Sequence, residues 1–234
     1  MTTYVLVHGA WHGGWCWVRV AERLRAAGHT VFTPTLTGLA DRAHLMGPTL
    51  SLQTHIRDVA GLLAWEELRD VVLVGHSYGG MVITGAADRV ADRIKTLVFL
   101  DALTPKHGQC AMDLRAPEQV AATFEAARTR GNGWRIPPTP AATFLVNEAD
   151  RAWVDAKCTD LPLACFTEHL HLSGAADRIT DRVYIRASGY PNPTFDTALA
   201  TARAAGWPCH EVPVGHDVMV DAPEELTRIL LESV

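Results

Sequence analysis

The sequence has little of the charge that binding to nucleic acid or to a membrane surface requires. Its 234 residues include 21 lysines and arginines against 26 aspartates and glutamates, which gives a formal net charge of −5. A nucleic acid or an anionic membrane would favour a basic face instead. Only 20% of the residues are charged, and the 48% that are hydrophobic can bury a sizeable core. We therefore expect a folded protein whose partner is a small molecule, and neither nucleic acid nor a membrane.

Long hydrophobic runs and cysteine patterns are absent as well. Charged residues, glycine or proline interrupt every apolar run before the roughly 18 residues of a membrane-spanning helix. The start of the chain, Met1 to His8, lacks the basic stretch and the long apolar run of a signal peptide. The five cysteines are odd in number and form no Cys-x-x-Cys pair, which indicates reduced thiols rather than disulfides or a zinc site. We expect a cytoplasmic protein that needs no metal or cofactor.

What the sequence does have is an alternation of short, β-rich apolar runs with stretches whose apolar residues recur at helical spacing. This alternation predicts an α/β fold with a mainly parallel sheet of about six strands, flanked by helices and joined by right-handed crossovers. Val71 to Val74 are too uniformly apolar for a strand with one solvated face, so this strand should be central. The expected strands cover residues 4–7, 30–33, 71–74, 96–100, 183–187 and 209–212, and the clearest helices cover 17–27, 51–63, 194–205 and a last segment from 223.

The alternation stops between Leu103 and Arg178. Prolines interrupt this stretch, and its patterning is helical rather than strand-like. At 234 residues the chain is long for a minimal domain and short for two. We therefore expect one core made of residues 1–102 and 179–234, with residues 103–178 inserted as a helical cap.

The segment from Gly75 to Gly79 reads Gly-His-Ser-Tyr-Gly and lies between the predicted central strand and a helix. A sharp strand-to-helix turn of this kind holds its serine in strained backbone geometry, and it needs glycines because side chains there would clash with the neighbouring strand and helix. The helix N-terminus adds N–H groups and a partial positive charge for a developing anion. A flexible helix entry can have the same five residues. Because strand, helix and partner residues are all in place, we predict that Ser77 is a nucleophile.

A serine hydroxyl needs a base to take its proton, so a histidine should follow on a separate loop. His216 lies after the last predicted strand and before the last helix, where the chain order serine, acid, histidine would put the base. We predict His216 as the general base. Two further histidines, His8 and His76, should be buried orienting groups beside the site. Four others fall on predicted surface elements: His29, His44, His55 and His107.

A carboxylate must hold the imidazole in the right tautomer and stabilise the imidazolium. Asp101 follows the strand after the nucleophile helix, at the edge where open α/β sheets assemble their sites. We favour Asp101 as this acid, although it could instead cap the turn formed with Thr104 and Pro105. The competitor is Asp196, which should lie inside the helix after the next-to-last strand, too far along to reach back.

Acyl transfer also needs N–H donors for the oxyanion, and backbone groups are suited because they cost no reorganisation. The turn after the first strand can place the N–H of Ala10 opposite that of Tyr78, which makes a two-donor oxyanion hole. Trp11 follows directly and should line the substrate pocket, whereas Trp15 fits core packing better. In the predicted cap, Trp134 and Trp153 fit either a pocket cover or packing against the core.

Three segments together carry a family resemblance: Val7 to Trp15, which reads Val-His-Gly-Ala-Trp-His-Gly-Gly-Trp; Gly-His-Ser-Tyr-Gly-Gly at 75–80; and Gly-His-Asp at 215–217. The chain resembles the α/β-hydrolase branch that contains plant methylesterases and hydroxynitrile lyases, together with many small bacterial esterases. The resemblance spans nearly the whole chain, loosely in the cap. It implies the α/β-hydrolase fold and the same nucleophile, base and oxyanion-hole residues as above.

The sequence departs from the plant members of that branch in two places. Residues 187–193 contain no acid after the penultimate strand, whereas Asp101 after the preceding strand is similar to the arrangement in relatives such as haloalkane dehalogenases. The lyases use a lysine just after the catalytic histidine and a threonine in the first loop. Asp217 and Gly9 stand at those positions here, so cyanohydrin cleavage is a poor fit.

Taken together, these residues predict a serine hydrolase that cleaves a small, largely apolar or aromatic carboxylic ester through an acyl-enzyme. A serine nucleophile argues against dehalogenation, which needs a carboxylate in that position. Two alternatives stay open: a lyase that uses the same triad, and a non-catalytic ligand receptor that keeps the pocket. The identity of the ester and the formation of a homodimer are left open.

Overall fold

Six parallel strands form one sheet in the computed structural model, which describes residues 1–233. Their order across the sheet is β2-β1-β3-β4-β7-β8, and every neighbouring pair is parallel. The number and direction of the strands confirm the predicted fold class. The strands are β1 (Thr3–Val7), β2 (Thr30–Phe32), β3 (Val71–His76), β4 (Ile94–Leu100), β7 (Asp181–Ala187) and β8 (Cys209–Val212).

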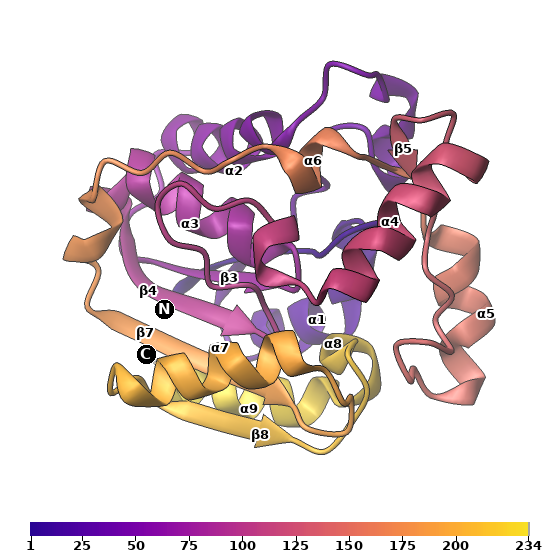
Figure 1. Ribbon diagram of the computed structural model, residues 1–234. Coiled ribbons are helices and arrows are strands. Elements are labelled where there is room, and N and C mark those ends of the chain that lie inside the picture. Colours follow the sequence, from indigo (N-terminus) through magenta and orange to yellow (C-terminus); the bar gives the residue numbers. More distant parts are fainter. Residues whose placement is uncertain (234) are drawn as a thin grey trace.

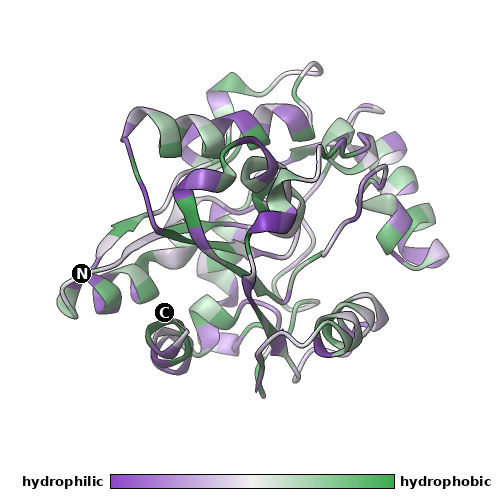
Figure 2. Ribbon diagram, turned by 90° about the vertical axis from the view of Figure 1, so that its left-hand side faces the viewer, coloured by the Kyte–Doolittle hydropathy of each residue, from purple (hydrophilic) through white to green (hydrophobic). Residues whose placement is uncertain are grey.

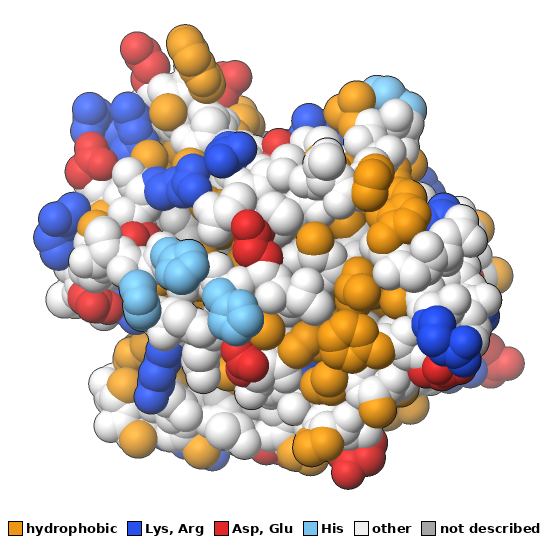
Figure 3. All heavy atoms as spheres, turned by 45° about the horizontal axis from the view of Figure 1, so that its top comes forward, with side chains coloured by type: hydrophobic (Ala, Val, Ile, Leu, Met, Phe, Trp, Pro, Cys, Tyr) orange, Lys and Arg blue, Asp and Glu red, His pale blue; other side chains and the backbone are white. Residues whose placement is uncertain are grey.

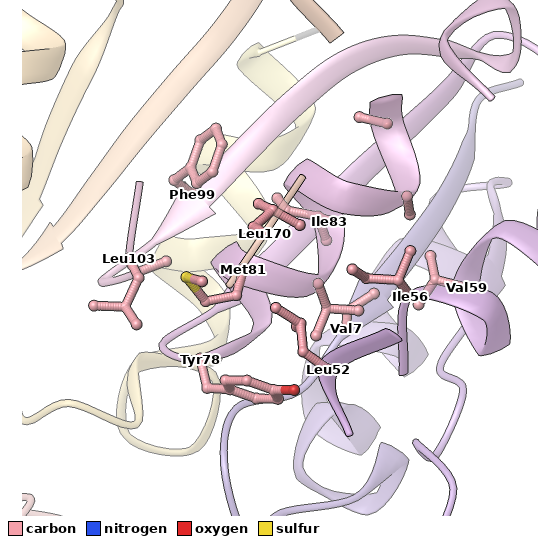
Figure 4. Close-up of a cluster of buried hydrophobic side chains, with 14 of the residues drawn as sticks. Val7, Leu52, Ile56, Val59, Tyr78, Met81, Ile83, Phe99, Leu103 and Leu170 are labelled. Carbon is pink, nitrogen blue, oxygen red and sulfur yellow. The ribbon is translucent and has the colours of Figure 1, made fainter. Parts of the chain in front are cut away.

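The central strand β3 shows why the sheet is buried on both faces. Successive side chains of a strand point to opposite faces. Val71 and Leu73 belong to one hydrophobic cluster, and Val72 and Val74 belong to another on the opposite face. All four are completely buried, which confirms the prediction of a central strand. Part of the first cluster is drawn in Figure 4, where side chains from β1, β4 and the neighbouring helices meet.

Two layers of helices cover these faces (Figure 1). In helix α2 (Leu52–Trp65), the buried residues recur at helical spacing, so the helix turns one apolar side to the sheet; they include Leu52, Ile56, Val59 and Leu63. Figure 2 shows the outer helices with both hydrophobic and hydrophilic turns. One cluster includes residues of α2 (Leu52–Trp65), α3 (Gly79–Arg89) and α7 (Pro193–Ala204); the other includes residues of α1 (Val18–Ala26), α8 (Val218–Asp221) and α9 (Pro223–Glu232).

The stretch between β4 and β7 contains helices but also a small sheet that the sequence pattern did not indicate. Residues 117–157 lie on the side of the molecule to which the arrowhead of β4 points, whereas the residues just before β7 run back to the opposite side (Figure 1). The predicted division into a core and a cap at residues 103–178 stays a prediction. The elements here are α4 (Pro117–Arg130), α5 (Glu148–Lys157), α6 (Ala164–Thr167) and the antiparallel pair β5 (Arg135–Ile136) and β6 (Leu161–Pro162).

Helix α5 packs against the first part of the chain. The rings of Trp153 and Trp15 meet edge to face with centroids 4.9 Å apart. Arg19 and Asp150 add an ion pair at 2.6 Å. Trp153 therefore serves packing between segments. Short 3₁₀ turns complete the chain: Gly14–Trp17, Ala40–Leu45, Ala91–Arg93, Met112–Leu114 and Ala175–Arg178.

The surface mixes charged and hydrophobic side chains. On the face drawn in Figure 3, hydrophobic side chains gather to the right of centre, and charged and histidine side chains are more frequent on the left. Within residues 1–233, no helix combines the length and the hydropathy that crossing a membrane would require. The cytoplasmic location stays a prediction, and whether the chain forms a homodimer stays open.

Replacing Gly80 with alanine tests the close packing at the start of α3. A Cβ at Gly80 would overlap the carbonyl oxygen of Leu103, so helix or loop must shift. We expect Gly80→Ala to lower the free energy of unfolding by about 1–3 kcal/mol. The matched change Gly61→Ala in α2, where nothing lies within 4 Å, should raise it by about 0.5–1 kcal/mol. Urea unfolding measures both, and equal stabilities would contradict the overlap.

Candidate active site

Ser77 occupies the sharp turn between β3 and α3. Its φ of 54° lies in the left-handed region, which is costly for a residue with a side chain. The surrounding backbone enforces this geometry, because the Ser77 N–H donates to the Leu100 carbonyl at 3.2 Å and the Ser77 carbonyl accepts from Gly80 and Leu103, both at 3.1 Å. The strained turn that the glycine-rich motif predicts is present.

His216 and Asp101 meet although 115 residues separate them in the chain. The Nδ1 of His216 lies 2.6 Å from Oδ2 of Asp101, and the two residues are 3% and 0% exposed. Because a carboxylate only accepts, the imidazole must carry its proton on Nδ1, and Nε2 can then accept one. Asp101 lies just past the end of β4 with a φ of 42°. The edge of the sheet therefore brings these two predicted residues together.

The second oxygen of Asp101 is held by Arg186, which sequence reasoning did not single out. Nη1 of Arg186 donates to Oδ1 at 2.7 Å, and the Ala187 N–H donates to the same oxygen at 3.2 Å. Nη2 of Arg186 donates to Asp196 at 2.8 Å. Asp196 lies on α7 with a mostly exposed side chain and is not among the hydrogen-bond partners of His216 in residues 1–233. An arginine inside an apolar strand was the available signal, because a buried charge requires a partner.

The two predicted oxyanion donors lie beside Ser77. Ala10 and Tyr78 are both buried, and both line the cavity that Ser77 and His216 line. In the part of the chain that the structure describes, neither backbone N–H has a hydrogen-bond acceptor. Unpaired buried N–H groups are rare because they cost free energy. Two such donors beside a strained serine can receive an oxygen anion.

The cavity has a volume of about 390 Å³ and a largely apolar wall that includes several aromatic rings. Trp11 lines it as expected, and its indole N–H donates to the Ile136 carbonyl at 2.9 Å. Trp134 and Trp153 do not line it. Three rings pack around the imidazole of His216, with centroids 5.0 to 5.2 Å from it; they belong to Phe144, Tyr190 and Phe195.

A buried ion pair holds the loop that carries His216. Nε2 of His12 lies 3.0 Å from Asp217, and Nδ1 of His12 lies 2.8 Å from the Ala10 carbonyl. Both neighbours only accept, so both ring nitrogens of His12 must carry protons. Burial opposes the charges, but Asp217 raises the pKa of His12, and His12 holds the pKa of Asp217 well below its usual range. The pair links the Ala10 turn to the loop after β8.

Histidines 8 and 76 are buried beside the site, as predicted. Burial lowers the pKa of His8 to about 3, and its Nε2 accepts the Leu36 N–H at 3.0 Å. Burial also lowers the pKa of His76, whose Nε2 donates to the His216 carbonyl at 3.0 Å. Both imidazole rings are therefore neutral. His8 holds the backbone at Leu36, and His76 holds the backbone at His216.

The surface placement expected for His55 was wrong. His55 is completely buried, and its Nδ1 lies 3.0 Å from the hydroxyl of Tyr78. The signal was available, because His55 falls between Leu52 and Ile56 on the apolar side of α2. This histidine ties α2 to the residue that follows Ser77.

Away from the cavity, one group of side chains has metal-ligand character. Cys110, Asp113 and His169 place ligand atoms within 4.8 Å of one another. None of the three lines the cavity. Burial raises the pKa of the Cys110 thiol, which opposes the thiolate that a metal would bind.

The chain is similar to known proteins in both sequence and structure. The model of the alpha/beta hydrolase family matches residues 4–229. A carbendazim hydrolyzing esterase from Nocardioides sp. (strain SG-4G) is 48% identical over 238 residues, which cover 98% of each chain. Methylesterase 10 of Arabidopsis thaliana is 27% identical over 255 residues, 98% of this chain and 90% of its own. A solved extracellular alpha/beta-hydrolase from a Paenibacillus species superposes with a TM-score of 0.85 at 24% identity, covering 100% of this chain and 99% of its own.

Removing the charge of Asp217 tests the buried pair. Asp217→Asn leaves a buried His12 without its carboxylate, so we expect a loss of about 3–5 kcal/mol in the free energy of unfolding near pH 6. The lowered pKa of Asp217 stabilises the fold above the unfolded pKa of about 4, and this stabilisation is lost as the pH falls further. The raised pKa of His12 contributes below about pH 6.5, and its contribution is lost as the pH rises through the folded value.

The gap between wild type and Asp217→Asn should therefore narrow as the pH is lowered below about 4. Urea unfolding between pH 3 and 7 measures the gap. A gap that stays constant with pH would mean that Asp217 acts through packing rather than through its charge.

Proposed function

The chain belongs to the α/β-hydrolase family and is an enzyme of the carboxylesterase type, and on this premise we propose that it cleaves small carboxylic esters through an acyl-enzyme on Ser77. The observation that carries the proposal is the 2.6 Å hydrogen bond between His216 Nδ1 and Asp101, at a cavity that Ser77 and His216 both line. A strained serine, a base with a fixed tautomer and an apolar cavity are the parts that acyl transfer needs.

In the first half of the reaction, Nε2 of His216 takes the proton of the Ser77 hydroxyl while Oγ attacks the ester carbonyl. The imidazolium that forms stays paired with Asp101, whose other oxygen is already bonded to Arg186. The carbonyl oxygen becomes an anion and accepts hydrogen bonds from the N–H groups of Ala10 and Tyr78. Collapse of this intermediate breaks the bond to the alkoxy oxygen, and His216 returns the proton to the leaving alcohol.

In the second half, a water molecule attacks the acyl group on Ser77. His216 takes a proton from this water, and the same two N–H groups hold the second oxyanion. Collapse releases the carboxylic acid, and the proton on His216 returns to Oγ of Ser77. In this mechanism His216 takes and returns the proton in every step of both halves of the reaction.

The cavity wall supports an ester with an apolar or aromatic part. Phe144 and Phe166 face the same cavity as Trp11, and rings of this kind bury large apolar area. Lining residues come from the sheet ends and from residues 103–178, which supports a cap role for that insertion. The relative at 48% identity is named for hydrolysing carbendazim, and this supports a small-molecule ester as substrate.

Replacing Ser77 with alanine tests the nucleophile. We expect Ser77→Ala to lower the hydrolysis of 4-nitrophenyl acetate by at least about 10⁴-fold, because no other group can form the acyl-enzyme. Mass spectrometry of the wild type, quenched during turnover, should show one acetyl group on Ser77. Cyanide release from mandelonitrile without ester turnover would instead support the lyase, and ligand-dependent partner binding without turnover would support the receptor.

Two asparagine substitutions separate the candidate acids. We expect Asp101→Asn to lower kcat by about 10⁴-fold, because the amide favours the wrong tautomer of His216. Asp196→Asn should keep the rate within about threefold, because the Asp196 side chain is mostly exposed and bonds to Arg186 rather than to His216, and an ion pair with an exposed partner contributes little. Steady-state kinetics on the same ester measures both changes. The assignment is wrong if the two effects are exchanged, and harmless substitutions at both sites would contradict the triad.

A further inference from the structure

Arg115 is a cation in the wall of the cavity that lacks a charged partner. In residues 1–233, no carboxylate oxygen lies within 4.0 Å of its guanidinium. Its hydrogen bond in this part of the chain runs from Nη1 to the Thr123 hydroxyl at 2.9 Å. The side chain is half-buried, and burial lowers its pKa. A desolvated cation without an anion is costly, so such groups are normally paired or ligand-binding.

The rest of the cavity wall does not supply the missing anion. Arg130 also lines the cavity, whereas no aspartate or glutamate of the described chain does. The chain as a whole has a net charge of −5, so the positive charge here is local. The cavity therefore favours a negative group at the Arg115 end.

Aromatic rings separate Arg115 from the reacting groups. Its guanidinium carbon lies 5.2 Å from the ring centroid of Phe166, whose ring lies 5.5 Å from that of Tyr78. On the other side, Tyr190 packs on His216 with centroids 5.1 Å apart. The ring of Phe166 thus contacts both Arg115 and Tyr78, the residue after Ser77. Because Arg115 and Ser77 line the same cavity, a molecule with its carbonyl at Ser77 can place a second group at Arg115 through an apolar spacer.

We propose that Arg115 binds a carboxylate of the substrate, so that the enzyme prefers esters which carry a second, ionised carboxyl group beyond a short apolar or aromatic spacer. This rests on the proposed function. A guanidinium presents five N–H donors in a planar fork that matches a carboxylate. The bond to Thr123 uses one donor and fixes the fork, and the others remain for the ligand. Composition alone indicated only a small molecule as partner, because composition averages over the chain and cannot show one unpaired charge.

The test compares two esters that differ only at the far end. One is the mono-4-nitrophenyl ester of adipic acid, and the other is its neutral ω-amide. We expect the wild type to favour the carboxylate by at least about tenfold in kcat/KM, because a hydrogen bond to a charged group contributes more than one to a neutral group. Arg115→Gln should abolish the preference mainly through KM, because the contact is remote from the reacting carbonyl. The readout is the ratio of the two kcat/KM values in each protein, so that a general effect of the substitution on the cavity cancels.

A control variant on the neighbouring helix α4, a lysine variant of Arg115 and a binding measurement separate the role of Arg115 from turnover. The Arg128 side chain on α4 is exposed, pairs with Glu125 and does not line the cavity. Arg128→Gln should therefore keep the full preference. Arg115→Lys should keep part of it, because lysine retains the charge without the fork. Titration calorimetry with adipate monoamide and adipamide reports binding without turnover, and only the first should bind tighter to wild type than to Arg115→Gln.

Hydrolysis of both esters at equal efficiency by the wild type would overturn the role of Arg115 and leave the esterase mechanism intact. Selective binding of adipate monoamide without hydrolysis of either ester would support Arg115 and contradict the proposed mechanism. Equal binding of adipate monoamide to the wild type and to Arg115→Gln would overturn the inference whatever the kinetics show.

Discussion

The Asp101 carboxylate, at the carboxyl end of β4, accepts hydrogen bonds from two other segments, the end of β7 and the loop after β8. His216 donates to one oxygen at 2.6 Å, and Arg186 and the Ala187 N–H donate to the other at 2.7 and 3.2 Å. A fully buried carboxylate needs such donors in place of the water it has lost. These bonds fix the end of β4, the end of β7 and the loop after β8 relative to one another. The position of His216 at the cavity that Ser77 also lines depends on that arrangement.

A second buried pair, His12 with Asp217, fixes the same loop to the turn that carries Ala10. The loop of His216, the proposed general base, and the turn of Ala10, a proposed oxyanion donor, are thus connected through two charges that satisfy each other. Arg115 differs from these residues, because it borders the cavity with a hydroxyl as its partner and no carboxylate. Paired charges here hold the protein's own loops in place, and the unpaired charge faces the space where a ligand would bind. This contrast is the physical basis for assigning Arg115 to the substrate.

Most of the fold could be predicted because the signals are local. Val71 to Val74 form a continuous apolar run, and α2 repeats its apolar residues every three or four positions. The pair β5 and β6 was missed because strands of two residues each are too short to show a period. His55 was placed on the surface, although it shares the apolar side of α2, because a polar residue type was given more weight than its position.

By itself the sequence determined the parallel sheet, the strained turn at Ser77 and the histidine after the last strand, since each is encoded within a few neighbouring residues. Tertiary structure alone decided which carboxylate meets His216: the two residues are 115 positions apart, and Asp196 turns to Arg186 instead. It also decided that Arg115 has no carboxylate within 4.0 Å in the described chain. Whether a charge is paired depends on distances between remote segments, and these exist only once the sheet and its helices have packed.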